Sequence, residues 1–144
     1  MMKEFWIDAR RSEVIDGAYF DVVFTVPAER NPLIYANQKL LYGLLHDASA
    51  KTVLELSADK KYLGAKPAII QVLHTWEQEL NYHPHIHCII SGAGLTPAMK
   101  LVRCKSNFMI HVKVLGAKFR DKFMDALEKY HKAEKLSKLR NSFE

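Results

Sequence analysis

Tyr82-His83-Pro84-His85-Ile86-His87-Cys88-Ile89-Ile90 is an apolar, β-branched segment in which two histidines flank one isoleucine. Side chains alternate between the two faces of a strand. A strand here therefore places His85 and His87 on one face and their even-numbered apolar neighbours on the other. Two neutral imidazoles on the same strand face are well placed to bind a divalent metal ion.

A second strand is predicted immediately before this segment. Residues 68–76 form an apolar, β-branched run after Pro67, and the polar run over 77–81 is typical of a turn. Two strands joined by a short polar link pair as an antiparallel hairpin. Such a hairpin brings the end of the first strand opposite His85 and His87.

The first third of the chain has one strand pattern and one helix pattern. Apolar and polar residues alternate over 19–26, which predicts a half-buried strand that ends at Pro27. Asn31-Pro32 is typical of a helix start, with Asn31 as the N-cap. Apolar residues at helical spacing then continue to about residue 56, which predicts one long helix.

The chain after the hairpin is expected to change direction at Gly92-Ala93-Gly94. Short edge strands are predicted at 101–104 and 108–110, and a long helix with a lysine-rich outer face is predicted from about 114 to 130. The order of elements favours an α+β fold, an antiparallel sheet with helices packed on one face. The histidines would then lie on the other, open face.

Length and composition indicate one domain with a real core. The chain has 144 residues, of which 49% are hydrophobic and 26% charged, and it contains no repeat or linker. We divide it into an N-terminal extension (1–17), a main domain (18–136) and a basic tail (137–144).

Charge and cysteine content limit the partners and the compartment. The net charge is +5, and basic residues concentrate in the last quarter, which fits a polyanionic partner. No apolar run approaches the ~20 residues of a membrane span, so no membrane partner is expected. Two cysteines and no recognisable signal peptide indicate a cytoplasmic protein. With DNA as its polyanionic partner, we expect it to be nucleoid-associated.

A third metal ligand is expected from the neighbouring strand. His74 is the first candidate, because antiparallel pairing can place it opposite the histidine pair. Gln78 is the alternative, since an amide oxygen can bind a hard cation, and Glu77 is a further option. Two or three protein ligands leave coordination positions open, which is typical of a catalytic site.

Several ordered stretches resemble a known family. His83-Pro84-His85-Ile86-His87 resembles the His-hydrophobic-His motif of the HUH endonucleases, and the set as a whole is similar to rolling-circle transposases of the two-tyrosine, insertion-sequence-91 type. The similarity covers about residues 18–130. The other matching stretches are Phe20-Asp21-Val22-Val23-Phe24-Thr25-Val26-Pro27-Ala28-Glu29, Asn31-Pro32-Leu33, Leu40-Leu41-Tyr42, Leu63-Gly64-Ala65, Leu73-His74-Thr75-Trp76 with Gln78, Gly92-Ala93-Gly94-Leu95, Phe119-Arg120 and Lys122-Phe123.

The resemblance implies a chemistry as well as an HUH endonuclease-like, ferredoxin-like sandwich. A Mg or Mn ion, held by the two histidines and a third polar ligand, would polarise the scissile phosphate of single-stranded DNA. A tyrosine would then attack that phosphorus and form a covalent link. The DNA would lie across the open face, held by basic residues, with Lys118, Arg120 and Lys122 as the expected contacts.

The chain departs from the family in its tyrosines. The family's paired nucleophilic tyrosines lie in a later helix, and no tyrosine here stands in that context. Tyr130 is the remaining candidate nucleophile, although its phase on the last helix favours a place in the core. We therefore expect a truncated transposase domain, incomplete and inactive by itself, that keeps the metal site. A homodimer is left open by the sequence.

Two other functions fit parts of the pattern. A non-catalytic DNA-binding remnant would have a regulatory or structural role. A small-molecule metalloenzyme with a double-stranded β-barrel also uses a His-x-His strand, but it would contain almost no helix.

Overall fold

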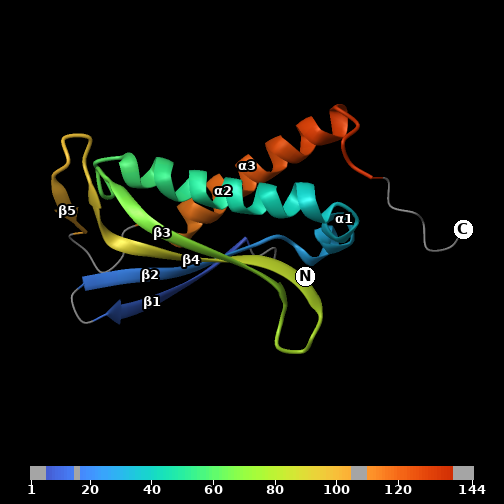
Figure 1. The fold of residues 1–144 in the computed structure, drawn as a ribbon, viewed down its shortest axis with the longest axis horizontal. Coiled ribbons are helices and arrows are strands. Elements are labelled where there is room, and N and C mark those ends of the chain that lie inside the picture. Colours follow the sequence, from blue (N-terminus) through green and yellow to red (C-terminus); the bar gives the residue numbers. More distant parts are fainter. Residues whose placement is uncertain (1–5, 15–16, 105–109, 138–144) are drawn as a thin grey trace, which may run out of the picture.

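The computed structural model describes residues 6–14, 17–104 and 110–137, with the backbone alone for 8–14 and 17–18. Five strands form one antiparallel sheet (Figure 1). Its order is β1-β2-β4-β3, and β5 pairs with the far end of β4. The strands are β1 (Ile7–Val14), β2 (Gly17–Thr25), β3 (Lys66–Trp76), β4 (Tyr82–Leu95) and β5 (Leu101–Arg103).

The helices lie together on one face of this sheet (Figure 1). The two longest have 21 residues each and contact one another across the layer. These helices confirm the predicted α+β class and exclude the double-stranded β-barrel. The helical elements are the 3-10 turn η1 (Ala28–Arg30), α1 (Asn31–Ala36), α2 (Gln38–Ala58) and α3 (Val112–Lys132). Within the described residues, no helix has the length and apolar character needed to cross a membrane.

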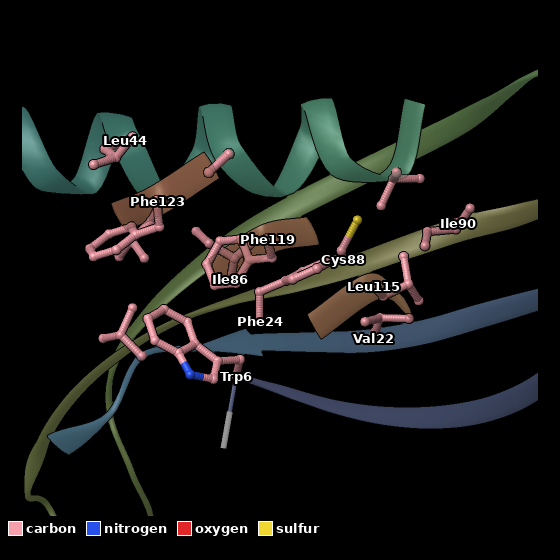
Figure 2. Close-up of a cluster of buried hydrophobic side chains, with 14 of the residues drawn as sticks. Trp6, Val22, Phe24, Leu44, Ile86, Cys88, Ile90, Leu115, Phe119 and Phe123 are labelled. Atoms are coloured by element: carbon pink, nitrogen blue, oxygen red, sulfur yellow. The ribbon is translucent and has the colours of Figure 1, made fainter. Parts of the chain in front are cut away.

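The core lies between the helix layer and the inner face of the sheet. Phe24 of β2 packs against Phe119 of α3 with ring centroids 4.9 Å apart, and Trp6 contacts Phe119 and Phe123 edge-on (Figure 2). Ile86, Cys88 and Ile90 of β4 join the same cluster. Burial of these side chains provides the main favourable free energy for the fold.

Strand β4 has the two-faced character that its sequence predicts. Its even-numbered residues from Pro84 to Ile90 are fully or almost fully buried against the helices. Burial raises the pKa of the Cys88 thiol to about 12, so this cysteine is an inert, apolar core group. The odd-numbered residues from His85 to Leu95 face the other side of the sheet, which the helices of the described residues leave open (Figure 1).

Two of the predicted elements differ from the structure in their course. The single helix expected from residue 31 is two helices, broken at Asn37, whose side-chain amide donates to the carbonyl oxygen of Leu33. Gly92-Ala93-Gly94 does not break the chain, because β4 continues to Leu95. Gly94 lets β3 approach closely, since a Cβ there would lie 2.6 Å from the carbonyl oxygen of Lys66.

Two further comparisons with the prediction concern strand β1 and the edge strands. Strand β1 precedes the first predicted strand and pairs with β2 from Ile7 to Val14, within the residues assigned to the N-terminal extension. The edge strand predicted at 101–104 is present as β5 over Leu101–Arg103, but most of the one predicted at 108–110 lies outside the described residues.

Candidate metal centre

The β3–β4 hairpin brings three histidines together on the open face. His74 of β3 pairs in register with His85 of β4, and Val72 pairs with His87. The ring centroid of His74 lies 5.3 Å from that of His85 and 4.3 Å from that of His87, and the centroids of His85 and His87 are 5.3 Å apart. The hairpin thus gathers the three histidines that the sequence predicted as ligands.

The three imidazoles fit a single divalent ion. One ring nitrogen from each of His74, His85 and His87 lies within 4.8 Å of the others. Two nitrogens bound to one ion at about 2.1 Å can be up to about 4.2 Å apart. Small side-chain rotations would therefore bring the three nitrogens close enough to bind one ion. Three imidazoles are borderline ligands that suit first-row divalent metals, and they leave coordination positions for an oxygen ligand.

An oxygen lies near the Nδ1 atom of each ring of the β4 pair, within hydrogen-bond distance at His85 and slightly beyond it at His87. The Nδ1 atom of His85 lies 2.7 Å from the carbonyl oxygen of His83, where an Nδ1–H donates a hydrogen bond. The Nδ1 atom of His87 lies 3.7 Å from Oδ1 of Asp21 on β2. A proton on Nδ1 leaves the lone pair of Nε2 free for a metal ion, which is the usual role of such outer contacts.

Asp21 is the functional candidate that the sequence analysis missed. Its Oδ1 atom is buried and has no hydrogen-bond partner among the described residues. A buried carboxylate oxygen without a partner is costly, and a nearby His87 that donates from Nδ1 would offset that cost. Its polar side chain in the alternating 19–26 pattern was the available signal, but only the pairing of β2 with β4 places it beside His87.

Burial changes the protonation of the central histidine. Desolvation lowers the pKa of His85 below its ordinary value, while the hydrogen bond to the His83 carbonyl acts in the opposite direction. The neutral form of His85 is the form that binds metal, so the site favours the ligand state.

The alternative ligands lie in the turn of the hairpin. Glu77 and Gln78 are exposed and follow the end of β3. The turn is held by the Leu80 amide, which donates to the Glu77 carbonyl oxygen, and by Asn81, whose Nδ2 donates to Oε1 of Glu77. The arrangement favours His74 over Gln78 as third ligand, and that choice stays a prediction.

The basic residues predicted to contact DNA lie elsewhere. Lys118 and Lys122 of α3 form ion pairs with Glu55 of α2, with N–O distances of 3.5 and 2.9 Å, and Arg120 pairs with Asp121. These residues belong to the helix layer, whereas the histidines face the opposite side of the sheet. The structure therefore does not bring them together with the histidine cluster.

Tyr130, the remaining candidate nucleophile, also belongs to the helix layer. It packs against the core from α3, as its helical phase indicated, and Lys135 lies over its ring. Its place does not bring it to the histidines.

Comparison with known proteins identifies the family. The family described as "Putative transposase" (Y2_Tnp) matches residues 68–143, a range that includes His74, His85 and His87. The chain belongs to the Y2_Tnp transposase family. The resemblance to rolling-circle transposases that the sequence suggested is thereby confirmed.

Two curated transposases are similar to this Y2_Tnp chain. "Putative transposase y4qJ" of Sinorhizobium fredii is 42% identical over 132 residues, which are 91% of this chain and 33% of that protein. The "Transposase for insertion sequence element IS801" of Pseudomonas savastanoi pv. phaseolicola is 31% identical over 90 residues, 62% of this chain and 21% of that protein. The chain thus spans about a third or less of the length of these relatives.

Solved structures show the same fold at low sequence identity. The conjugative relaxase TrwC in complex with oriT DNA, in its copper-bound form, superimposes with a TM-score of 0.58 at 15% identity. That match covers 81% of this chain and 45% of the relaxase chain. TrwC with a 27-mer DNA that comprises the recognition hairpin and the cleavage site gives 0.59 at 20% identity, over 81% and 48% of the two chains. The Y2_Tnp chain therefore has the HUH relaxase fold, as predicted.

Proposed function

We propose that this chain is the metal-binding part of a transposase that nicks and joins single-stranded DNA in rolling-circle transposition. The observation that carries the proposal is the cluster of His74, His85 and His87 on the open face of the sheet, in a member of a transposase family. The TrwC structures support it, because they are of a relaxase with this fold in a metal-bound form and in complex with DNA.

The residues of the chain divide the work at the site. His74, His85 and His87 would hold Mg²⁺ or Mn²⁺, and Asp21 and the His83 carbonyl would keep the β4 rings in the correct tautomer. A cation bound there supplies positive charge that polarises a phosphate oxygen. The uncovered face around the cluster would admit a single DNA strand.

The attacking tyrosine would come from outside this chain. Burial and the hydrogen bond with Tyr42 raise the pKa of Tyr82, which is the opposite of what a nucleophile requires. Tyr19 of β2 lies on the same face of the sheet as the histidines. However, the β2 residue that pairs with His87 is Val23, and Tyr19 is four residues, or about 13 Å along the strand, away from it. Tyr130 lies in the helix layer.

Metal titration tests the ligand set. We expect Mn²⁺ affinity, measured by isothermal titration calorimetry, to fall by more than ~100-fold in His74→Ala, His85→Ala and His87→Ala, since each change removes a direct ligand. Gln78→Ala is the matched control, and its affinity should stay within about threefold of the parent. A large loss in Gln78→Ala with none in His74→Ala would make Gln78 the third ligand. Unchanged binding in all four would refute the site.

A cleavage assay tests the missing nucleophile. Labelled single-stranded hairpin DNA should bind in the presence of Mn²⁺ without forming a covalent protein adduct. An adduct that disappears in Tyr130→Phe or Tyr82→Phe would show that the chain carries its own nucleophile.

A non-catalytic DNA-binding remnant is the second candidate, and the basic surface of α3 is the observation that favours it. Lys118, Arg120 and Lys122 are on the helix layer, remote from the histidines, so binding there would not need metal. DNA binding that is unchanged by EDTA and His85→Ala, yet falls steeply with salt, would support this function. The domain division, the homodimer and the nucleoid location stay predictions.

A further inference from the structure

Trp76 is an exposed aromatic side chain next to the histidine cluster. It ends β3 two residues after His74, beyond a shift in the β3–β4 register that lies between these two residues, and 57% of its surface is accessible. The other tryptophan, Trp6, is buried in the core at 8% exposure. Two residues along a strand span about 6.6 Å, so the backbone of Trp76 lies about one nucleotide away from that of His74, a proposed ligand.

The indole is held in place from one side by an aromatic chain. Trp76 meets the ring of Tyr82 edge-on at 5.9 Å, and Tyr82 meets Tyr35 edge-on at 5.3 Å. Tyr82 is itself fixed by a 2.6 Å hydroxyl contact with Tyr42, and its carbonyl oxygen accepts from Nδ2 of Asn31. An anchored ring with a free surface needs little further ordering when a flat ligand stacks on it.

The surrounding face is suited to bases rather than to phosphates. Ile70, Val72 and Ile89 are exposed hydrophobic residues on the same face of β3 and β4. The described side chains of β2, β3 and β4 include one lysine and no arginine. That lysine, Lys66, lies eight residues from His74, at the opposite end of β3. Close contacts beside the histidines would therefore be apolar and aromatic, with the phosphate reserved for the metal.

We propose that Trp76, supported by Tyr82, is a stacking platform for a nucleobase that adjoins the phosphate bound at the histidine cluster. The inference rests on the proposed function and adds a binding subsite to it. Every base has a flat face, so such a platform holds the strand with little regard to sequence. Its role is to fix which phosphate lies at the cluster.

Binding of a short single-stranded oligonucleotide tests the platform. One stacked base contributes ~1–3 kcal/mol, so Trp76→Ala should bind the oligonucleotide about 5- to 150-fold more weakly in Mn²⁺. Trp76→Phe keeps a flat ring and should stay within about fivefold of the parent. Leu101→Ala is the matched control, because Leu101 is exposed at 61% on β5, which pairs with the end of β4 away from the histidines, and it should bind within about twofold.

Fluorescence and abasic substrates locate the contact. In a Trp6→Phe background, Trp76 is the single tryptophan of the chain, and stacking should quench its emission as DNA is added. An abasic site at the contacted nucleotide should weaken binding to the parent but leave binding to Trp76→Ala unchanged. Circular dichroism and Mn²⁺ titration of each variant should match the parent, since Trp76 is neither a core residue nor a proposed ligand.

The outcomes separate this inference from the function on which it rests. If the parent chain binds no single-stranded DNA, both proposals fail. If the parent binds DNA and Trp76→Ala binds equally well, the platform is refuted and the proposed function stands. Equal losses in Trp76→Ala and Leu101→Ala would refute stacking in favour of a general apolar contact. Dissociation of a dimer by Trp76→Ala, with no quenching by DNA, would assign the indole to a second copy of the chain.

Discussion

The two faces of β4 have opposite environments although their residues alternate along one strand. Pro84, Ile86, Cys88 and Ile90 are buried against the helices, whereas His85 and His87 face an open surface. The inner residues make the core and the outer ones gather candidate ligands. Stability and metal binding should therefore be separable by single substitutions at adjacent positions.

Ile86→Ala should have the largest effect, on the inner face alone. Ile86 is fully buried, and truncating such a side chain costs about 2–5 kcal/mol through lost burial and the cavity left behind. Urea unfolding in EDTA would measure the loss. Ile89→Ala is the control on the outer face, where 38% exposure predicts a loss below about 1 kcal/mol. Equal losses at both positions would contradict the separation of the faces.

Asp21→Asn should act on the outer face alone. Removing an outer contact of a metal-bound imidazole typically weakens metal binding 10- to 100-fold, and Asp21 is 3.7 Å from His87. Calorimetric titration with Mn²⁺ would show this loss, while the urea midpoint in EDTA should change little. An unchanged affinity would mean that His87 does not depend on Asp21 for its orientation.

Glu55→Gln should have the smallest effect and tests the outer surface of the helix layer. The hydrogen bond and charge of Lys122, with Lys118, lower the pKa of Glu55. A depressed carboxylate pKa stabilises the fold above the unfolded value near 4.5 and loses that contribution as the pH falls through the folded pKa. For a solvent-exposed pair the contribution is about 0.2–1 kcal/mol.

Urea unfolding at pH 7 and pH 3.5 measures that contribution. The parent should lose slightly more stability on acidification than Glu55→Gln does. An identical response in both proteins would show that Glu55 titrates as it does in the unfolded chain. Metal binding should be the same in both at pH 7, because Glu55 lies on the side of the molecule opposite the histidines.

The features that the sequence predicted correctly are those that depend on residues close together in the chain. The alternation in β4 and the short turn after β3 gave the hairpin, the helix-covered face and the pairing of His74 with His85. The break at Asn37 was not predictable from apolar spacing, because the stripe continues through it. The Asn37 side chain donates to the Leu33 carbonyl oxygen and accepts from the amide of Ser137, a residue far away in the sequence. Gly94 suggested a turn, but it serves a close approach between strands.

Other features depend on contacts between distant segments. Asp21 reaches His87 because β2 lies beside β4, and no local pattern specifies that neighbour. Lys118 and Lys122 looked like free cations in the sequence, but α2 and α3 pack so that both meet Glu55. A charged residue on a predicted helix can therefore be proposed to bind a ligand only when its partners in the folded protein are known.

The pairing of His74 with His85 has a consequence for folding. All three candidate ligands come from one hairpin, with ten residues between His74 and His85 in the chain. The loop that closes between them therefore carries a small entropic penalty. A slip of one residue between β3 and β4 would turn His74 toward the helices and break up the ligand set. A metal ion that binds all three rings would therefore select the correct strand alignment, and could do so early, before the helices have packed.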